Sequence, residues 1–205
     1  MTDIIPIYDQ DAAHYDQDYR SERWNRAGGG IQSLVFYHQI ALKCAGLLSS
    51  ASSIHDYGCG QGDGAALLQA FFPQARVKGF DFSAGGVDLA KARWPTVEFG
   101  VCNIRNASET ADVIVTSHTL EHVAKADEII RDLRKLCMWL VVVVPDTPGG
   151  ELDKTHFMCE PTRMWLERVR PRAVQVEGYL TDRRWAPEEP AMRESNILSV
   201  FQGDL

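Results

Sequence analysis

A run of glycines stands between an apolar segment and a helical one, in DYGCGQGDG (residues 56–64). A tight turn needs one or two glycines, because only glycine readily adopts a left-handed backbone. The remaining glycines remove Cβ atoms and let a bound molecule lie against the main chain. The helix that follows directs its free N–H groups at acceptor atoms of such a molecule. The segment therefore predicts a floor for a nucleoside-type ligand.

Histidine is the natural general base near neutral pH, and the chain has six. We predict that His118, His122 and His156 are the catalytic residues, because all three fall on loops that follow apolar, strand-like runs. His118 and His122 are four residues apart. His156 follows TPGGELDKT, which has the composition of a mobile flap able to exclude water. The other three are interpreted as structural or surface residues: His14, His38 and His55.

Short apolar runs alternate with helical patterns along most of the chain. We expect strands at residues 53–57, 75–82, 96–101, 111–118 and 138–145. We expect helices at residues 31–48, 64–72, 84–94, 126–136 and 160–169. This β–α alternation is typical of an α/β fold, a Rossmann-like three-layer sandwich with helices on both faces of a mostly parallel sheet.

The end of the chain departs from this rhythm. Two expected strands, residues 172–180 and 195–205, are joined by a polar, proline-bearing loop with no helix between them. Strands joined in this way are expected to pair antiparallel. The sequence thus predicts a seven-stranded sheet with a C-terminal antiparallel hairpin. In such sheets the ligand lies outside the carboxyl ends of the strands, where the strand order reverses.

Composition favours a small-molecule ligand. The chain has 205 residues with 45% hydrophobic residues, enough for one full core. Its net charge is −7, so bulk nucleic-acid binding is unexpected. No apolar stretch of about 20 residues predicts a membrane span. The acidic start carries no export signal, and five scattered cysteines are typical of a reduced, cytoplasmic protein.

Two ligand classes fit the glycines. GQGDGA (residues 60–65) satisfies the dinucleotide pattern G-x-G-x-x-[GA], but the glycines already begin at Gly58 and an acid, Asp56, stands on the strand. The register is D-x-G-x-G-x-G, and here the sequence resembles the class I S-adenosylmethionine-dependent methyltransferases over residues 54–201. ADVIVTSHTLEHV (residues 111–123) resembles the ubiquinone-biosynthesis-like branch of that family.

The resemblance implies S-adenosyl-L-methionine as cofactor and a set of residues that bind it. Asp81 would take the ribose hydroxyls, Phe82 and Ile104 would lie along the adenine, and Asn103 would accept from its amino group. The full set comprises Asp56, Gly58, Cys59, Gly60, Gly62, Asp81, Phe82, Asn103, Ile104, Ser117 and His118. The implied activity is methyl transfer to an oxygen or nitrogen nucleophile of a small molecule, the methyl acceptor being the expected partner.

The resemblance also implies one domain over residues 1–205, in which residues 1–30 form an N-terminal lid and residues 31–205 the catalytic core. AGGG (residues 27–30) is interpreted as the hinge between them. Tyr15, Tyr19 and Trp24 either face the cofactor from the lid or belong to an amphipathic helix packed on the sheet.

Three alternatives stay open. His118, Glu121, His122 and His156 resemble the E-x-x-E-H…H metal arrangement of small-RNA 2′-O-methyltransferases. A histidine at the first position removes a hard oxygen ligand, so no metal is expected. A non-catalytic methyltransferase-like binding partner would carry the same cofactor motifs. An NAD-dependent oxidoreductase is disfavoured because the chain lacks a Tyr-x-x-x-Lys pair where short dehydrogenases carry it.

Overall fold

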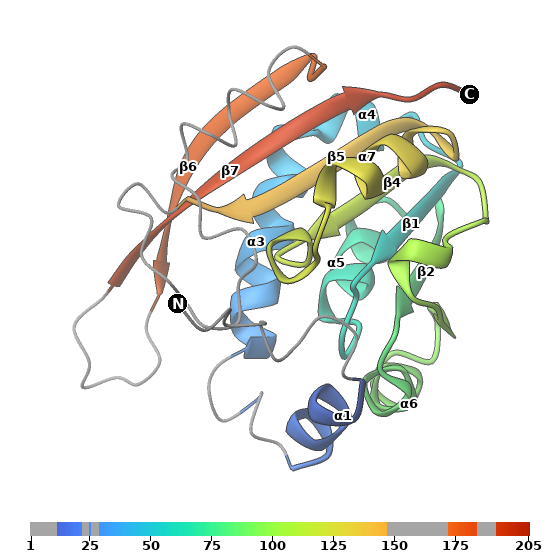
Figure 1. The fold of residues 1–205 in the computed structure, drawn as a ribbon, viewed down its shortest axis with the longest axis vertical. Helices are drawn as coiled ribbons and strands as arrows, with labels where there is room; N and C mark the ends of the chain where they lie inside the picture. The colour runs from blue at the N-terminus through green and yellow to red at the C-terminus, as the bar shows by residue number, and fades with distance from the viewer. Residues whose placement is uncertain (1–11, 22–24, 26–28, 147–171, 184–191) are drawn as a thin grey trace, which may run out of the picture.

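The computed structural model describes residues 12–21, 25, 29–146, 172–183 and 192–205 (Figure 1). The helices in these ranges are α1 (Ala12–Arg20), α3 (Gly29–Lys43), α4 (Ala45–Leu48), α5 (Asp63–Phe71), α6 (Ala84–Arg93) and α7 (Ala126–Arg134). The strands are β1 (Ser53–Tyr57), β2 (Arg76–Asp81), β3 (Glu98–Val101), β4 (Ala111–Ser117), β5 (Cys137–Pro145), β6 (Gln175–Arg183) and β7 (Met192–Gln202). Two short 3-10 turns are η1 (Ile104–Asn106) and η2 (Leu120–His122).

The seven strands form one sheet in the order β3-β2-β1-β4-β5-β7-β6. The first five strands are parallel, and β7 runs antiparallel to both β5 and β6. The order reverses between β1 and β4, so the carboxyl ends of these two strands flank the topological switch point. The predicted α/β fold with its terminal antiparallel hairpin is confirmed.

The sheet is buried on both faces, because helices cover each side. One core cluster joins α3, α5 and α6 to the sheet and includes Phe36, Leu68 and Val87. The other core cluster joins α7 to the sheet and includes Ile130 and Leu133. Within β4, Val113 and Val115 belong to the first cluster and Ile114 to the second, as the two-residue period of a strand requires. Figure 1 shows the resulting three layers.

The hinge expected at residues 27–30 needs correction, and one expected helix lies outside the described residues. Gly29 and Gly30, expected in a hinge, are the first residues of α3. A Cβ atom at Gly30 would lie 3.3 Å from Asp63 Oδ2 and from Asn25 Oδ1, so the glycine there permits close packing against α5. The helix expected at residues 160–169 lies outside the described residues.

Strand ends were predicted to within a few residues at most positions. The hairpin strands differ most, since β6 extends to Arg183 and β7 begins at Met192, so that β6 and β7 pair over nine positions. Within the described ranges, no helix combines the length and the apolar character that crossing a membrane demands.

Candidate active site

The glycine loop leaves β1 in a left-handed backbone conformation at three positions. The φ angles of Gly58, Gly60 and Gly62 are 86°, 53° and 81°. A Cβ atom at Gly58 would lie 2.1 Å from Thr119 Oγ1, which excludes any side chain there. The amides of Gly58 and Cys59 both donate to the carbonyl of Phe80, at 2.8 and 3.0 Å. The loop is therefore fixed between the carboxyl ends of β1, β2 and β4.

Asp81 ends β2 and holds the loop from the other side. Its Oδ2 accepts from the amide of Gly60 and its Oδ1 from the amide of Ser83, both at 2.8 Å. The residue is buried, and desolvation raises the pKa of its carboxyl to about 6 despite these hydrogen bonds. Each carboxylate oxygen has a second lone pair, so Asp81 retains capacity to accept from a ligand.

Asp56 on β1 is fully buried and has one partner of unexpected origin. The phenol of Tyr37, on α3, donates to Asp56 Oδ1 at 2.5 Å. Among the described residues, Asp56 Oδ2 has no hydrogen-bond partner. Desolvation raises the pKa of Asp56 to about 7; the Tyr37 hydrogen bond opposes this shift, and the nearby Asp81 charge adds to it. Sequence reasoning missed Tyr37, although a buried tyrosine needs a partner for its hydroxyl.

Helix α1 closes the far side of the glycine loop. Asp16 accepts from Ser83 Oγ and from the amide of Gly85, at the start of α6. Tyr19 is buried, and Cβ atoms at Gly60 and Gly86 would lie 2.8 and 3.0 Å from its side chain. Tyr19 thus fills a slot that two glycines leave open, and Figure 1 shows α1 beside α6.

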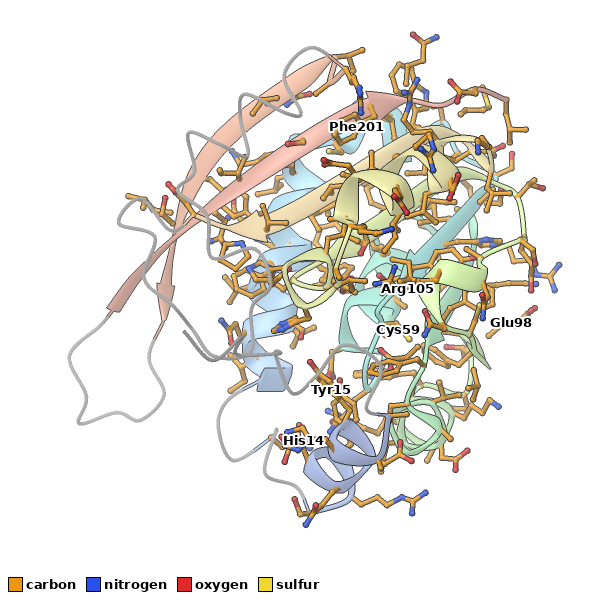
Figure 2. All side chains as sticks on the ribbon, in the orientation of Figure 1. His14, Tyr15, Cys59, Glu98, Arg105 and Phe201 are labelled. Carbon is orange, nitrogen blue, oxygen red and sulfur yellow. The ribbon has the colours of Figure 1, made fainter. Side chains whose placement is uncertain are left out.

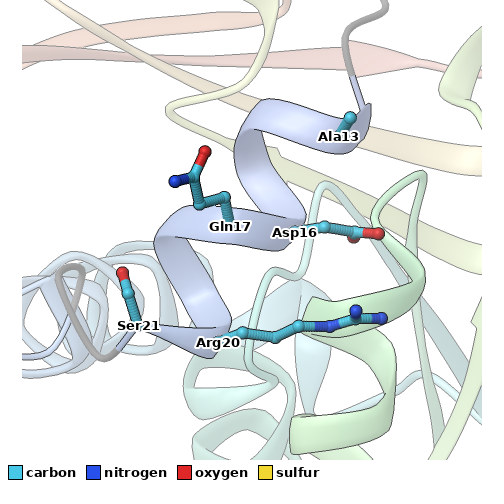
Figure 3. A pocket seen from close by; sticks show the side chains of 5 residues that line it. All are labelled: Ala13, Asp16, Gln17, Arg20 and Ser21. Carbon is cyan, nitrogen blue, oxygen red and sulfur yellow. The ribbon is translucent and has the colours of Figure 1, made fainter.

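The outer side of α1 carries a surface pocket lined by Ala13, Asp16, Gln17, Arg20 and Ser21 (Figure 3). Asp16 and Arg20 both extend from α1 toward α6.

Tyr15 packs edge-on against Phe82, with ring centroids 5.2 Å apart. Figure 2 places Tyr15 on the side of α1 that faces the sheet.

Ser117 ends β4 and His118 follows it, across the switch point from Asp56. His118 has a φ of 53°, a left-handed conformation that costs a non-glycine residue roughly 1–2 kcal/mol. Its ring stacks on Phe36, with centroids 3.7 Å apart and planes at 9°. The ring nitrogens lie 3.0 Å from Ser117 Oγ and 2.8 Å from Asn196 Oδ1. Sequence reasoning missed Asn196, which reaches the site from β7.

These features match known proteins. Residues 32–188 match a family described as methyltransferase domain. The chain belongs to this methyltransferase family. Trans-aconitate 2-methyltransferase of Escherichia coli O17:K52:H18 is 31% identical over 137 residues, 64% of this chain and 54% of that protein. The same enzyme of Escherichia coli K12 (DH10B) is 29% identical over 137 residues. The chain thus spans about half the length of the curated relatives it matches.

Solved structures share the fold of this methyltransferase. Magnesium protoporphyrin IX methyltransferase of Synechocystis PCC 6803 with bound S-adenosylhomocysteine superposes with a TM-score of 0.65 at 18% identity, covering 87% of this chain and 86% of that one. The plantazolicin methyltransferase in complex with S-adenosylhomocysteine gives a TM-score of 0.60 at 14% identity, covering 89% of each chain. Both neighbours show that the chain has the fold of methyltransferases solved with S-adenosylhomocysteine.

The residues at the switch point fit S-adenosylmethionine. S-adenosylmethionine carries a sulfonium and an α-ammonium, and its ribose presents two hydroxyls. Two buried carboxyls with raised pKa values, Asp56 and Asp81, border the glycine loop. One of their oxygens, Asp56 Oδ2, is buried without a partner in the described part of the chain. A cationic ligand with donor groups meets both needs, because it stabilises the charged carboxylates and supplies the missing donor.

The adenine contacts predicted from sequence stay predictions. Asn103 follows β3 and uses its Oδ1 to accept from the amide of Arg105 at 3.0 Å, as the cap of η1. Ile104 is half-buried and packs against the second core cluster. The side chain of Cys59 belongs to the first core cluster, so only the main chain of Cys59 is left to contact a ligand.

The structure describes His122 but not His156, the two other histidines predicted to be catalytic. His122 ends η2, and its Nε2 lies 3.9 Å from Oε1 of the buried Glu121. His156 and Trp24 lie outside the described residues. Where the structure describes the chain, no three histidine, cysteine or carboxylate residues group closely enough for a metal ion. His55 is buried against Phe80, His14 faces Asp18, and His38 contacts Phe71.

Proposed function

We propose that this methyltransferase moves the methyl group of S-adenosylmethionine to an oxygen or nitrogen nucleophile of a small molecule. The observation that carries the proposal is the acidic floor of the switch point. Two buried carboxyls flank a glycine loop that has three residues in the left-handed conformation. Such a floor suits a cationic adenosyl ligand far better than the anionic pyrophosphate of a dinucleotide.

The bound cofactor supplies a methyl group already activated on a sulfonium. The nucleophile's lone pair forms the new bond to the methyl carbon, the carbon–sulfur bond breaks, and its electron pair stays on sulfur. The protein therefore has to align acceptor and cofactor and exclude water. A protonated nucleophile must also lose its proton to a base.

The environment of His118 favours an acceptor that needs no base. Its two ring nitrogens lie within hydrogen-bond distance of Ser117 Oγ and Asn196 Oδ1, so both nitrogens are already engaged by side chains of the protein. A carboxylate is ionised at neutral pH and attacks without proton removal. The relatives act on trans-aconitate, a carboxylate. We therefore propose a small carboxylic acid as the first acceptor class to test.

Residues 1–30 are proposed as a lid over a single domain that comprises residues 1–205. The support comes from α1, which docks on α6 through Asp16 and fills the slot between Gly60 and Gly86 with Tyr19. We expect Asp16→Ala to raise the dissociation rate of S-adenosylmethionine about threefold, measured by stopped-flow fluorescence. An unchanged rate in this variant would argue that α1 is a fixed wall.

The finer branch assignment is also part of this proposal. ADVIVTSHTLEHV supports a relation to the ubiquinone-biosynthesis-like branch, and His118, His122 and His156 are the residues proposed to act on the acceptor. His156→Ala is expected to lower turnover far more than cofactor affinity. Equal losses in both would make His156 a structural residue.

The test begins with calorimetric titration of the chain with S-adenosylmethionine, S-adenosylhomocysteine and NAD. We expect micromolar binding of the two adenosyl ligands and no binding of NAD. A screen of small carboxylic acids, alcohols and amines with methyl-labelled cofactor then identifies the acceptor. Tight binding of cofactor with no transfer to any acceptor would favour a non-catalytic binding partner. NAD binding alone would overturn the proposal.

A further inference from the structure

Helix α3 inserts one polar atom into the cofactor floor. Tyr37 is buried on the face of α3 that packs against the sheet, and its hydroxyl donates to Asp56 Oδ1 at 2.5 Å. Its ring lies over the first turn of α5, where a Cβ atom at Gly64 would come within 2.5 Å of it. The glycine and the tyrosine fit each other, and this fit fixes the position of the hydroxyl beside Asp56.

The hydrogen bond leaves the two oxygens of Asp56 in different situations. Oδ1 accepts from Tyr37, whereas Oδ2 has no partner within the described ranges. The residue has no exposed surface. A buried carboxylate oxygen without a donor is costly, and native proteins rarely retain one unless a ligand or water satisfies it. The unsatisfied atom therefore marks a place for a donor supplied by the ligand.

The charges around Asp56 show what kind of donor is needed. Tyr37 faces it from α3, Asp81 from β2, and the thiol of Cys59 lies in the adjoining loop. Tyr37 offers a neutral hydrogen bond and Asp81 a negative charge. The Tyr37 hydrogen bond favours the charged form of Asp56, and burial and Asp81 oppose it. A cationic donor would complete the stabilisation of the carboxylate.

We propose that Tyr37 is a positioning residue that holds Asp56 ionised, with Oδ2 left to accept from the α-ammonium of the cofactor's amino-acid end. This inference rests on the proposed function, since it takes S-adenosylmethionine as the ligand. It assigns to α3 a part in cofactor binding that the glycine loop and Asp81 do not perform. Tyr37 acts through Asp56, so removing its hydroxyl should matter only while Asp56 is present.

The experiment compares ligands with and without the amino-acid end. Dissociation constants of S-adenosylmethionine, S-adenosylhomocysteine and 5′-methylthioadenosine are measured for the wild type, Tyr37→Phe, Asp56→Asn and the double variant. Phenylalanine keeps the ring on Gly64 and removes only the hydroxyl. Tyr57→Phe is the matched control, because Tyr57 is a buried tyrosine whose ring belongs to the other core cluster. Circular dichroism and thermal melts establish that each variant is folded.

The expected result is selective. Tyr37→Phe should weaken the two amino-acid-bearing ligands about tenfold and change 5′-methylthioadenosine less than twofold. The loss should shrink to less than twofold when Asp56→Asn is already present, as a double-mutant cycle shows for coupled residues. The pH at which S-adenosylmethionine affinity is half-maximal should also rise in Tyr37→Phe, because the hydrogen bond favours the charged carboxylate.

Three outcomes would overturn the inference. An equal loss for all three ligands would make Tyr37 a packing residue. No loss for any ligand would show that the hydrogen bond does not contribute to binding. Additive losses in the double variant would show that Tyr37 acts independently of Asp56. If the wild type binds no adenosyl ligand, the proposed function itself fails, which is a different result from binding that is unaffected by Tyr37→Phe.

Discussion

The two sides of the switch point are built in different ways. On the side of β1 and β2, main-chain amides of the glycine loop bind Phe80 and Asp81, and Asp56 lies beside them with Tyr37 of α3 as its partner. On the side of β4, His118 is held by side chains from α3 and from β7, which are remote in sequence. The first side is a local device encoded by a motif, and the second is assembled from distant segments. We therefore expect mutations to separate cofactor binding from acceptor handling.

The comparison predicts its largest effect at Asp81. Asp81→Ala should weaken the affinity for S-adenosylmethionine roughly 100-fold. The reason is that the amides of Gly60 and Ser83 lose their acceptor, and each unsatisfied group costs roughly 1–3 kcal/mol. Calorimetry measures the loss. Asp132→Ala, at an exposed carboxylate on α7, is the control and should bind normally. Unchanged affinity in Asp81→Ala would mean that the cofactor lies elsewhere.

Gly58 lies where the two sides meet. Gly58→Ala should lower the free energy of unfolding by roughly 2–4 kcal/mol, because its φ is 86° and the added Cβ would overlap Thr119 of the β4 side. Urea denaturation measures this quantity. Gly46→Ala is the matched control, since its Cβ would meet no atom within 4 Å and lies inside a helix. Equal stability of the two variants would contradict the close contact between the sides.

The pH dependence of stability isolates Asp56. Its pKa is raised by burial to about 7, so the unfolded chain releases this proton more readily than the folded one. In the cofactor-free protein, protonated Asp56 favours the folded state. This contribution to stability is fully present below about pH 4 and is lost as the pH rises toward 7. Relative to Asp56→Asn, the wild type should lose roughly 1.4 kcal/mol or more between pH 5 and 8, the value of at least one pKa unit. Parallel curves would show that Asp56 titrates normally.

The smallest effect is expected on the β4 side. Asn196→Ala removes the partner of His118 Nε2 while the ring keeps its stack on Phe36. Turnover should fall about fivefold, corresponding to the roughly 1 kcal/mol of one hydrogen bond, and cofactor affinity should stay within twofold. Ser199→Ala, at another buried polar residue of β7, should leave both unchanged. A large loss of cofactor affinity in Asn196→Ala would end the separation of the two sides.

Sequence reasoning named more residues on the proposed cofactor side than on the proposed acceptor side, for a physical reason. The glycine pattern and Asp81 are separated by one strand and one helix, so the β–α rhythm alone places them at one sheet edge. Tyr37 and Asn196 are brought to the site by tertiary packing, and single-sequence periodicity carries no information about which helix crosses which strand. The hinge expected at residues 27–30 was missed for a similar reason, because Gly29 and Gly30 begin α3 and Gly30 packs closely against Asp63.

The placement of β7 between β5 and β6 sets an order of assembly during synthesis. His118 and Asn196 are 78 positions apart, and Asn196 belongs to the strand that enters the sheet last along the chain. The ribosome has therefore released α1, the glycine loop and Asp81 long before the partner of His118 exists. During synthesis, the residues of the proposed cofactor floor are therefore present before Asn196, whose amide oxygen contacts His118.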